Sequence, residues 1–275
     1  MLRETIGRDT TLCMSLAARP GTFGSRFHNR LYAALGLDFV YKAFTTRDLP
    51  AAIAGVRALG IRGCAISMPF KEDVIPLLDA LAPTAAAIHS VNTIVNDQGR
   101  LTGHNTDYGA IGQLLLRHDV ASHTPFALLG SGGMAKAVGC ALRDAGFRDG
   151  TVVARNERAG RALAQATGYV WTPRLGAERP RMLINVTPIG MAGGADADAL
   201  PFDARVVADA DIVFDVVAVP AETPFVRAAR TSHKRVITGA EVIALQALDQ
   251  FVLYTGVQPT EAQLRDAIAF AQGAA

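Results

Sequence analysis

The segment Phe126 to Val138 constrains the fold more than any other part of the chain. It reads FALLGSGGMAKAV, in which a short apolar run leads directly into a glycine-rich turn and then into a helix-forming sequence. Glycines permit a tight turn and let the backbone approach a pyrophosphate, which the helix N-terminus would hold. A second strand-like run, TVVARN, follows in the order that a dinucleotide-binding unit requires. We expect cofactor contacts from Gly130, Ser131, Gly132, Gly133, Met134 and Ala135, with a purely structural turn as the alternative.

The end of the second run bears on which dinucleotide is bound. An acidic residue there would hydrogen-bond the ribose hydroxyls of NAD, whereas arginine accommodates the extra phosphate of NADP. Arg155 and Arg158 flank this end, with Asn156 between them, so the sequence favours NADP over NAD. Glu157 argues the other way unless it points away from the phosphate. The alternative for both arginines is an ordinary surface position.

Strand-like and helix-like runs alternate along almost the whole chain, which predicts an α/β fold with mainly parallel sheets. We expect a change of domain near residue 104 and a return near residue 240. Residues 90–97 and 100–105 flank a turn and predict a hairpin. Strands are expected at 11–16, 38–44, 61–68, 90–97, 100–105, 125–130, 151–156, 181–187, 211–217 and 234–239, and helices at 23–35, 49–60, 107–118, 133–145, 157–166, 240–254 and from 259 onward.

Composition excludes several classes of protein. Hydrophobic residues make up 50% and charged residues 19% of 275 residues, as in a globular protein, and the net charge of +2 comes without a basic cluster. We therefore expect neither nucleic acid nor a membrane as partner. The N-terminal segment MLRETIGRDTTLCMS lacks the apolar core of a signal peptide, and three widely spaced cysteines suit a cytoplasmic protein. No histidine spacing predicts a metal site, and a monomer and a homodimer both stay open.

Two residues are candidates for proton transfer. Lys71 ends the run AISMPFK and is one of four lysines among 27 lysines and arginines. Lysine can exchange its proton and arginine cannot, and hydride transfer from an alcohol requires a group that takes the hydroxyl proton. Asp107 follows the second hairpin strand, and α/β folds place ligands at strand ends. The alternatives are a surface lysine and a helix cap at Thr106 or Asp107.

The order of several motifs resembles the shikimate dehydrogenase family over essentially the whole chain. Seven motifs in the same order are far more specific than any one of them. They are SMPFK with Lys71, SVNT with Asn92, GHNTDYGA with Asp107, GSGGMAKA at 130–137, NVTPIGM at 185–191, DVVAVPAETP at 215–224 and GAEVIALQALDQF with Gln246.

The resemblance implies a substrate-binding domain (1–103 and 240–275) and a Rossmann-type NADP-binding domain (104–239). It implies an oxidoreductase of aromatic amino acid biosynthesis, in the chorismate pathway, that interconverts 3-dehydroshikimate and shikimate, with Lys71 and Asp107 as the catalytic pair. Amide and carboxylate side chains suit a small hydroxylated substrate. By the family pattern, Asn92, Asp107 and Gln246 bind the substrate, and Asn185, Thr187, Met191, Val216 and Gly239 contact the cofactor. The alternatives are hydrogen-bonded polar groups in turns and, for Met191, core packing.

Three departures from the family bear on the substrate. The Ser-x-Ser-Pro that holds the carboxylate is replaced by SLAARPGTFGSRFHN, in which Ser15, Thr22 and Ser25 are candidate donors. The family's Asn-x-Thr reads Ala65-Ile66-Ser67, and a usual tyrosine is Ala218. Each lost neutral hydrogen bond weakens binding by about 0.5–1.5 kcal/mol. Quinate, another shikimate-like hydroxy acid, and a weakly active NADP- or metabolite-binding protein are therefore alternatives.

Overall fold

The computed structural model describes residues 6–273. Residues 1–5, which begin the segment considered for a signal peptide, and residues 274–275, at the end of the expected C-terminal helix, lie outside this range. The chain divides into two compact units: unit 1 (Met1–Thr106 and Gln246–Ala275) and unit 2 (Asp107–Leu245). The assignment of substrate and cofactor to domains bounded at residues 104 and 240 stays a prediction.

Unit 1 is built on a mixed, mainly parallel sheet with the strand order β2-β1-β3-β5-β6-β4. The predicted hairpin is present as β5 and β6, and its turn uses Gln98 and Gly99 at positive φ. β2 lies at one edge and pairs only with β1 among the described strands. The strands are β1 (Thr11–Leu16), β2 (Phe39–Phe44), β3 (Gly63–Ile66), β4 (Ala80–Leu81), β5 (Thr93–Asp97) and β6 (Arg100–His104).

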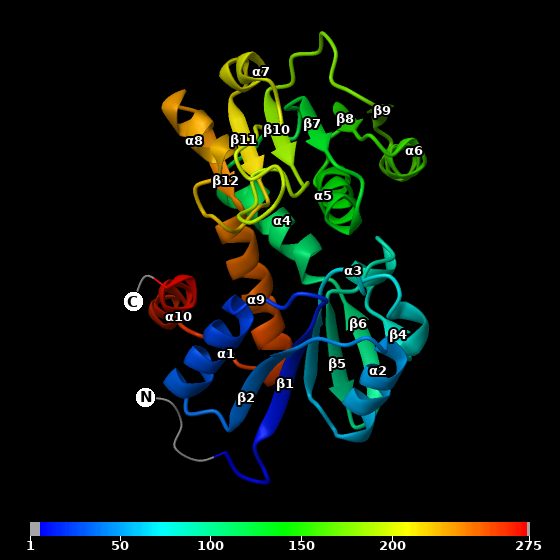
Figure 1. Ribbon diagram of the computed structural model, residues 1–275, viewed down its shortest axis with the longest axis vertical. Coiled ribbons are helices and arrows are strands. Elements are labelled where there is room, and N and C mark those ends of the chain that lie inside the picture. The colour runs from blue at the N-terminus through cyan, green and yellow to red at the C-terminus, as the bar shows by residue number, and fades with distance from the viewer. Residues whose placement is uncertain (1–5, 274–275) are drawn as a thin grey trace. The chain divides into compact units, whose positions relative to one another are not determined.

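Helices cover both faces of this sheet (Figure 1). Successive side chains of a strand point to opposite faces, so Cys13 packs with α1, α9 and α10 while Met14 packs with α2. Asp48 caps α2, and Thr260 with Gln263 forms a capping box at α10. The helices are α1 (Phe23–Ala34), α2 (Leu49–Ala58), η1 (Ile75–Leu77), α3 (Pro83–Ala86), α9 (Gly239–Thr255), whose first turns belong to unit 2, and α10 (Glu261–Gln272).

Unit 2 contains an all-parallel sheet with the order β12-β11-β10-β7-β8-β9. Numbered within the unit and read from the other edge, this is 3-2-1-4-5-6, the order of the doubly wound dinucleotide-binding fold. The direction of winding reverses between β7 and β10, where such folds bind their ligands. The strands are β7 (Phe126–Leu129), β8 (Gly150–Val153), β9 (Val170–Thr172), β10 (Met182–Asn185), β11 (Ile212–Asp215) and β12 (Arg235–Thr238).

The helices of unit 2 pack against this sheet through two apolar clusters, one on each face. Asn156 and Thr223 each cap the helix that follows them, and Gly168 at φ 78° ends α6. The sequence therefore contains start and stop signals for these elements. The helices are α4 (Thr106–Arg117), α5 (Gly133–Asp144), α6 (Glu157–Thr167), α7 (Ala204–Asp209) and α8 (Pro224–Thr231).

The structure corrects the sequence analysis in its short elements. The strand expected at 61–68 spans only Gly63–Ile66, because the chain turns at Ser67, whose carbonyl accepts from the Phe70 amide at 3.0 Å. Six short elements were not expected: η1, β4, α3, β9, α7 and α8. None of the described helices combines the length and apolar character that crossing a membrane requires. Cys13, Cys64 and Cys140 are buried free thiols.

His28 is a titratable group in the core of unit 1. Its ring is 0% exposed and stacks on Tyr41, with ring centroids 4.4 Å apart and an interplanar angle of 9°. Phe27 packs edge-on against the same ring, with centroids 5.4 Å apart. Neither ring nitrogen has a hydrogen-bond partner among residues 6–273. Burial lowers the pKa of His28 to about 3, so the ring is neutral near neutral pH.

We predict that His28 makes unit 1 less stable in mild acid. The unfolded chain takes up a proton at its ordinary pKa near 6.5, whereas the folded chain does not, so the stability present above about pH 6.5 is lost as the pH falls. From about pH 7.5 to pH 5 this removes about 2 kcal/mol from the free energy of unfolding. Urea titrations should show that His28→Phe abolishes this loss. An equal loss in His28→Phe and in a variant of the exposed His123 would contradict the prediction.

Candidate active site

The glycine-rich turn of unit 2 connects β7 to α5 at the switch point of the sheet. Gly130 has φ +128°, and a Cβ there would lie 2.7 Å from Val186 Cγ2, so only glycine fits. Gly132 precedes α5 and supplies no side-chain cap, and a Cβ added to it would meet nothing within 4 Å. Gly132 is exposed, and the first amides of a helix have no partner within the helix, so the start of α5 is a candidate phosphate-binding position. Ala135 is 0% exposed and packs in the core, so only its backbone can serve a ligand.

The predicted NADP-selecting residues lie at the C-terminal end of β8, and all are exposed. Asn156 accepts from the Ala159 amide at 3.1 Å, so its side-chain oxygen caps α6. Glu157 accepts from Arg161 at 2.8 Å, which neutralises the carboxylate that argued for NAD. Arg155 and Arg158 have no carboxylate within ion-pair distance in residues 6–273. The geometry therefore presents two unpaired guanidinium groups at this strand end.

A buried hydrogen-bond network joins the loops that follow β10 and β11. Asp215 is 0% exposed and accepts from Thr223 Oγ1 at 2.6 Å and from Asn185 Nδ2 at 3.0 Å. Asn185 Oδ1 in turn accepts from the backbone amide of Thr187 at 3.0 Å and its hydroxyl at 2.7 Å. Burial raises the pKa of Asp215, and these donors oppose the shift. The network fixes the loop that follows Asn185 and carries the predicted residue Thr187.

Three other predicted cofactor residues lie around this network. Met191 is 36% exposed, which argues against core packing as its role. Val216 is half-buried and packs against the core of unit 2. A Cβ on Gly239 would overlap the carbonyl of Val217, so the chain passes too closely there for any side chain.

In unit 1, Asn92 is the centre of a second buried network. Its Oδ1 accepts from the Thr106 amide at 2.9 Å and from Thr93 Oγ1 at 2.8 Å, and its Nδ2 donates to Thr106 Oγ1 at 3.0 Å. Thr106 Oγ1 lies 3.4 Å from Gln246 Oε1, and Gln250 Nε2 donates to Thr93 Oγ1 at 3.0 Å. The network connects β5 and the start of α4 with α9. It brings the predicted substrate residues Asn92 and Gln246 together.

The backbone of Lys71 contacts the residue that precedes Asn92. Lys71 is half-buried, and its carbonyl accepts from the Val91 amide at 2.8 Å, next to Asn92. Ser67 is exposed at the turn before it. Asp107 is 5% exposed and lies in the first turn of α4, where the helix dipole stabilises a carboxylate. The pairing of Lys71 with Asp107 stays a prediction.

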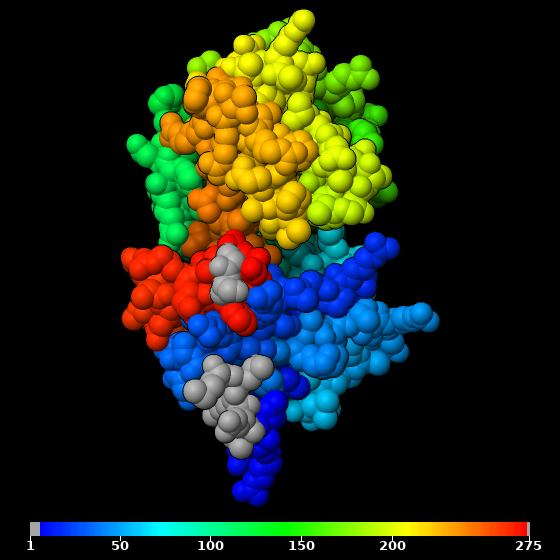
Figure 2. Space-filling view, turned by 60° about the vertical axis from the view of Figure 1, so that its left-hand side comes forward, coloured from blue at the N-terminus to red at the C-terminus, as the bar shows by residue number. Residues whose placement is uncertain are grey.

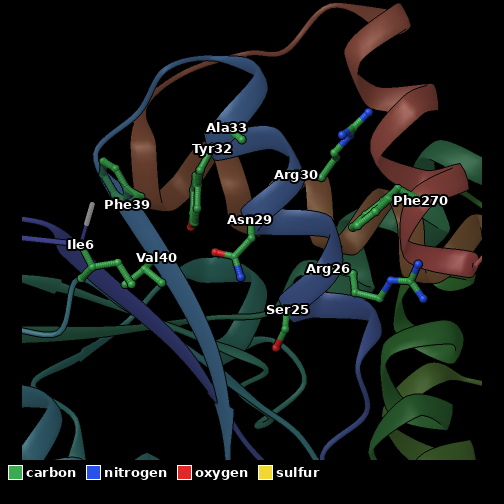
Figure 3. A pocket seen from close by; sticks show the side chains of 10 residues that line it. All are labelled: Ile6, Ser25, Arg26, Asn29, Arg30, Tyr32, Ala33, Phe39, Val40 and Phe270. Carbon is green, nitrogen blue, oxygen red and sulfur yellow. The ribbon is translucent and has the colours of Figure 1, made fainter. Parts of the chain in front are cut away.

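The structure separates the three candidate donors for the substrate carboxylate. Ser15 lies in β1 near the phenol of buried Tyr41. Ser25 lines a pocket beside α1 that contains none of the other predicted site residues (Figure 3). Thr22 is exposed at the N-cap of α1, and its side chain makes no capping hydrogen bond. Thr22 therefore has the most available hydroxyl of the three.

Sequence reasoning missed the residues that fix the candidate side chains within each unit. Asp215, Thr223, Thr93 and Gln250 are all buried and hydrogen-bonded, yet none was expected. Two signals were present. An aspartate at the end of an apolar strand must find donors, and a threonine directly before a proline is a typical helix N-cap.

Known proteins resemble this chain over its whole length. Residues 22–94 match the family described as "Shikimate dehydrogenase substrate binding domain". A shikimate dehydrogenase-like protein of Haemophilus influenzae is 51% identical over 267 residues, which cover 97% of this chain and 98% of that protein.

Two solved structures share the fold. Shikimate 5-dehydrogenase of Thermus thermophilus, in complex with NADP(H) and shikimate, has a TM-score of 0.85 and 31% identity, covering 95% of this chain and 100% of the other. Quinate dehydrogenase of Corynebacterium glutamicum, in complex with NAD, has a TM-score of 0.83 and 28% identity, covering 94% and 98%.

We predict that Thr223 stabilises unit 2 through Asp215. Thr223→Val removes a hydrogen bond to a buried carboxylate and the cap of α8, which should lower the free energy of unfolding by about 2–4 kcal/mol. Thr231→Val is the matched control on the same helix, because its exposed hydroxyl donates only to the Arg227 carbonyl. Urea denaturation measures both. Equal, small effects of the two substitutions would contradict the prediction.

Proposed function

The chain belongs to the shikimate dehydrogenase family, and we propose that it is an NADP-dependent oxidoreductase that interconverts shikimate and 3-dehydroshikimate. The observation that carries the proposal is the likeness, over 95% of the chain, to a dehydrogenase solved with NADP(H) and shikimate. The lysine and carboxylate that such a reaction requires are both present, as Lys71 and Asp107. Aromatic amino acid biosynthesis is the matching pathway.

Unit 2 is the proposed NADP-binding domain. The pyrophosphate would lie at the N-terminus of α5, against Gly130 to Gly133. Arg155 and Arg158 would bind the 2′-phosphate, since Glu157 is engaged by Arg161. The loop from Asn185 to Met191, with Val216 and Gly239, would contact the nicotinamide end. NADP, when bound, accepts or supplies the hydride.

Unit 1 supplies the proposed substrate-binding residues. Asn92 uses one amide hydrogen on Thr106, which leaves the other for a substrate hydroxyl. Gln246, at the same network, would bind a second hydroxyl, and Ser67 and Thr22 lie in the segments that the family pattern assigns to the substrate. Lys71 would take the proton from the reacting hydroxyl during oxidation and return it during reduction. Asp107 would orient the lysine side chain toward the reacting hydroxyl.

Oxidation of quinate or another shikimate-like hydroxy acid is the alternative. It is favoured by the altered carboxylate-binding segment, in which Ser15, Thr22 and Ser25 are the candidate donors, and by Ala65 and Ala218. A quinate dehydrogenase is similar to this chain in fold, which supports this alternative. The two activities differ in substrate and leave the proposed proton transfer unchanged.

We predict that Lys71→Arg binds NADP and substrate but turns over slowly. The charge is kept, whereas the proton can no longer be exchanged, so kcat should fall by about 100-fold or more with a small change in KM. Initial rates followed by the absorbance of the reduced nicotinamide measure this effect. Lys42→Arg, at an exposed position in β2, is the control. Wild-type kcat in Lys71→Arg would contradict the assigned role.

We predict that the arginines at the end of β8 select NADP. The double variant Arg155→Ala/Arg158→Ala should raise KM for NADP about 10–100-fold, because two charge-assisted contacts to phosphate are lost. KM for NAD should change little. Arg205→Ala, at an exposed position of α7, should change neither the KM for NADP nor the KM for NAD. Initial rates with each cofactor test the prediction. An equal rise in both KM values would show that the arginines do not read the phosphate.

A further inference from the structure

A pocket of about 540 Å³ lies in unit 1 along the outward face of α1, between β2 and α10 (Figure 3). This volume is typical of sites for small organic ligands. The pocket is lined by residues of α1 and by Phe270 of α10, whose surfaces are blue and red in Figure 2. The pocket contains none of Lys71, Asp107, Asn92 or Gln246, so its role is independent of the proposed function. Its apolar lining is Ile6, Tyr32, Ala33, Phe39, Val40 and Phe270.

Two of its four polar side chains are already occupied by protein groups. Asn29 accepts from the Tyr41 amide at 2.9 Å and donates to the Tyr41 carbonyl at 2.8 Å. Its side chain therefore satisfies the backbone hydrogen-bonding groups of Tyr41 at the edge strand β2. This blocks the addition of another strand at that point. Arg30 donates to both carboxylate oxygens of Asp266, at 2.6 and 3.1 Å. Its charge is therefore neutralised within unit 1.

Arg26 is the pocket cation that forms no ion pair among residues 6–273, and its Nη1 lies next to Gly273 at the C-terminal end of α10. Its guanidinium lies over the ring of Phe270, 4.7 Å from the centroid, and no carboxylate within residues 6–273 pairs with it. The neighbouring Ser25 hydroxyl makes no hydrogen bond within the same range. In Figure 3 the Arg26 guanidinium points toward Phe270 on one side of α1, and the Ser25 hydroxyl points in another direction. Phe39, Val40 and Ile6 lie on the opposite side of the view.

We infer that this pocket binds an amphipathic monocarboxylate with an aromatic or aliphatic body. The carboxylate would pair with Arg26, while the body would lie against the apolar lining of the pocket. A single negative charge fits better than a phosphate dianion, because within residues 6–273 Arg30 is already paired with Asp266 and Arg26 is the pocket arginine without a carboxylate partner. An anion without an apolar body would leave the apolar lining exposed to water.

The test is isothermal titration of the full chain with 4-phenylbutanoate as the probe and its neutral amide as the matched control ligand. The carboxylate should bind saturably, one per chain, and about tenfold more tightly than the amide. Arg26→Leu should abolish this preference, whereas Arg265→Leu, at an exposed position of α10 outside the pocket, should retain it. Ala33→Trp, which fills the pocket from an exposed helix position, should abolish binding of both ligands.

Three outcomes would overturn the inference. The first is the absence of saturable binding of 4-phenylbutanoate to the wild-type chain up to its solubility limit. The second is binding that Arg26→Leu and Ala33→Trp leave unchanged, with folding confirmed by wild-type circular dichroism. The third is a change of oligomeric state in Ala33→Trp without any probe binding to the wild type, which would show that a second copy covers this face.

Discussion

The hydrogen bonds of Asn92 are the interaction on which the arrangement of unit 1 depends. Its side chain is 3% exposed, and within residues 6–273 it ties β5 to the first turn of α4 through Thr106. Its backbone continues the sheet on both sides, since its carbonyl accepts from Ile66 at 2.7 Å and its amide donates to His104 at 3.1 Å. Each buried donor or acceptor left unpaired would cost about 1–3 kcal/mol. The hydrogen bonds of Asn92 therefore both join neighbouring strands of the sheet and hold the candidate site residues of unit 1 in place.

Unit 2 uses the same principle with a carboxylate in place of an amide. Asp215 is held by donors from the end of β10, the loop after β11 and the cap of α8. Burying a carboxylate is unfavourable unless several donors surround it, and here they also fix the loop that would meet the nicotinamide. In both units, buried polar groups at strand ends position the candidate side chains, and the exposed side chains are left to meet ligands.

The sequence predicted what depends on local pattern. The GSGG turn, the hairpin and the long helices were confirmed, because strand and helix periodicity, glycine and cap residues act over a few neighbours. Helices α7 and α8 were missed because they are short, and their caps at Asp203 and Thr223 lie within polar loops. The direction of Glu157 could not be predicted, since its pairing with Arg161 competes with a ligand that the sequence does not contain. Likewise, Ser15, Thr22 and Ser25 are equivalent in sequence, and only the structure shows that their surroundings differ.

The most direct test of the account is an initial-rate assay of the wild-type chain with shikimate and quinate, each combined with NADP and NAD. The account predicts the highest kcat/KM for shikimate with NADP. A higher kcat/KM for quinate with NAD would contradict the proposed substrate and cofactor. No turnover with any pair, by protein that binds NADP, would contradict the proposed reaction.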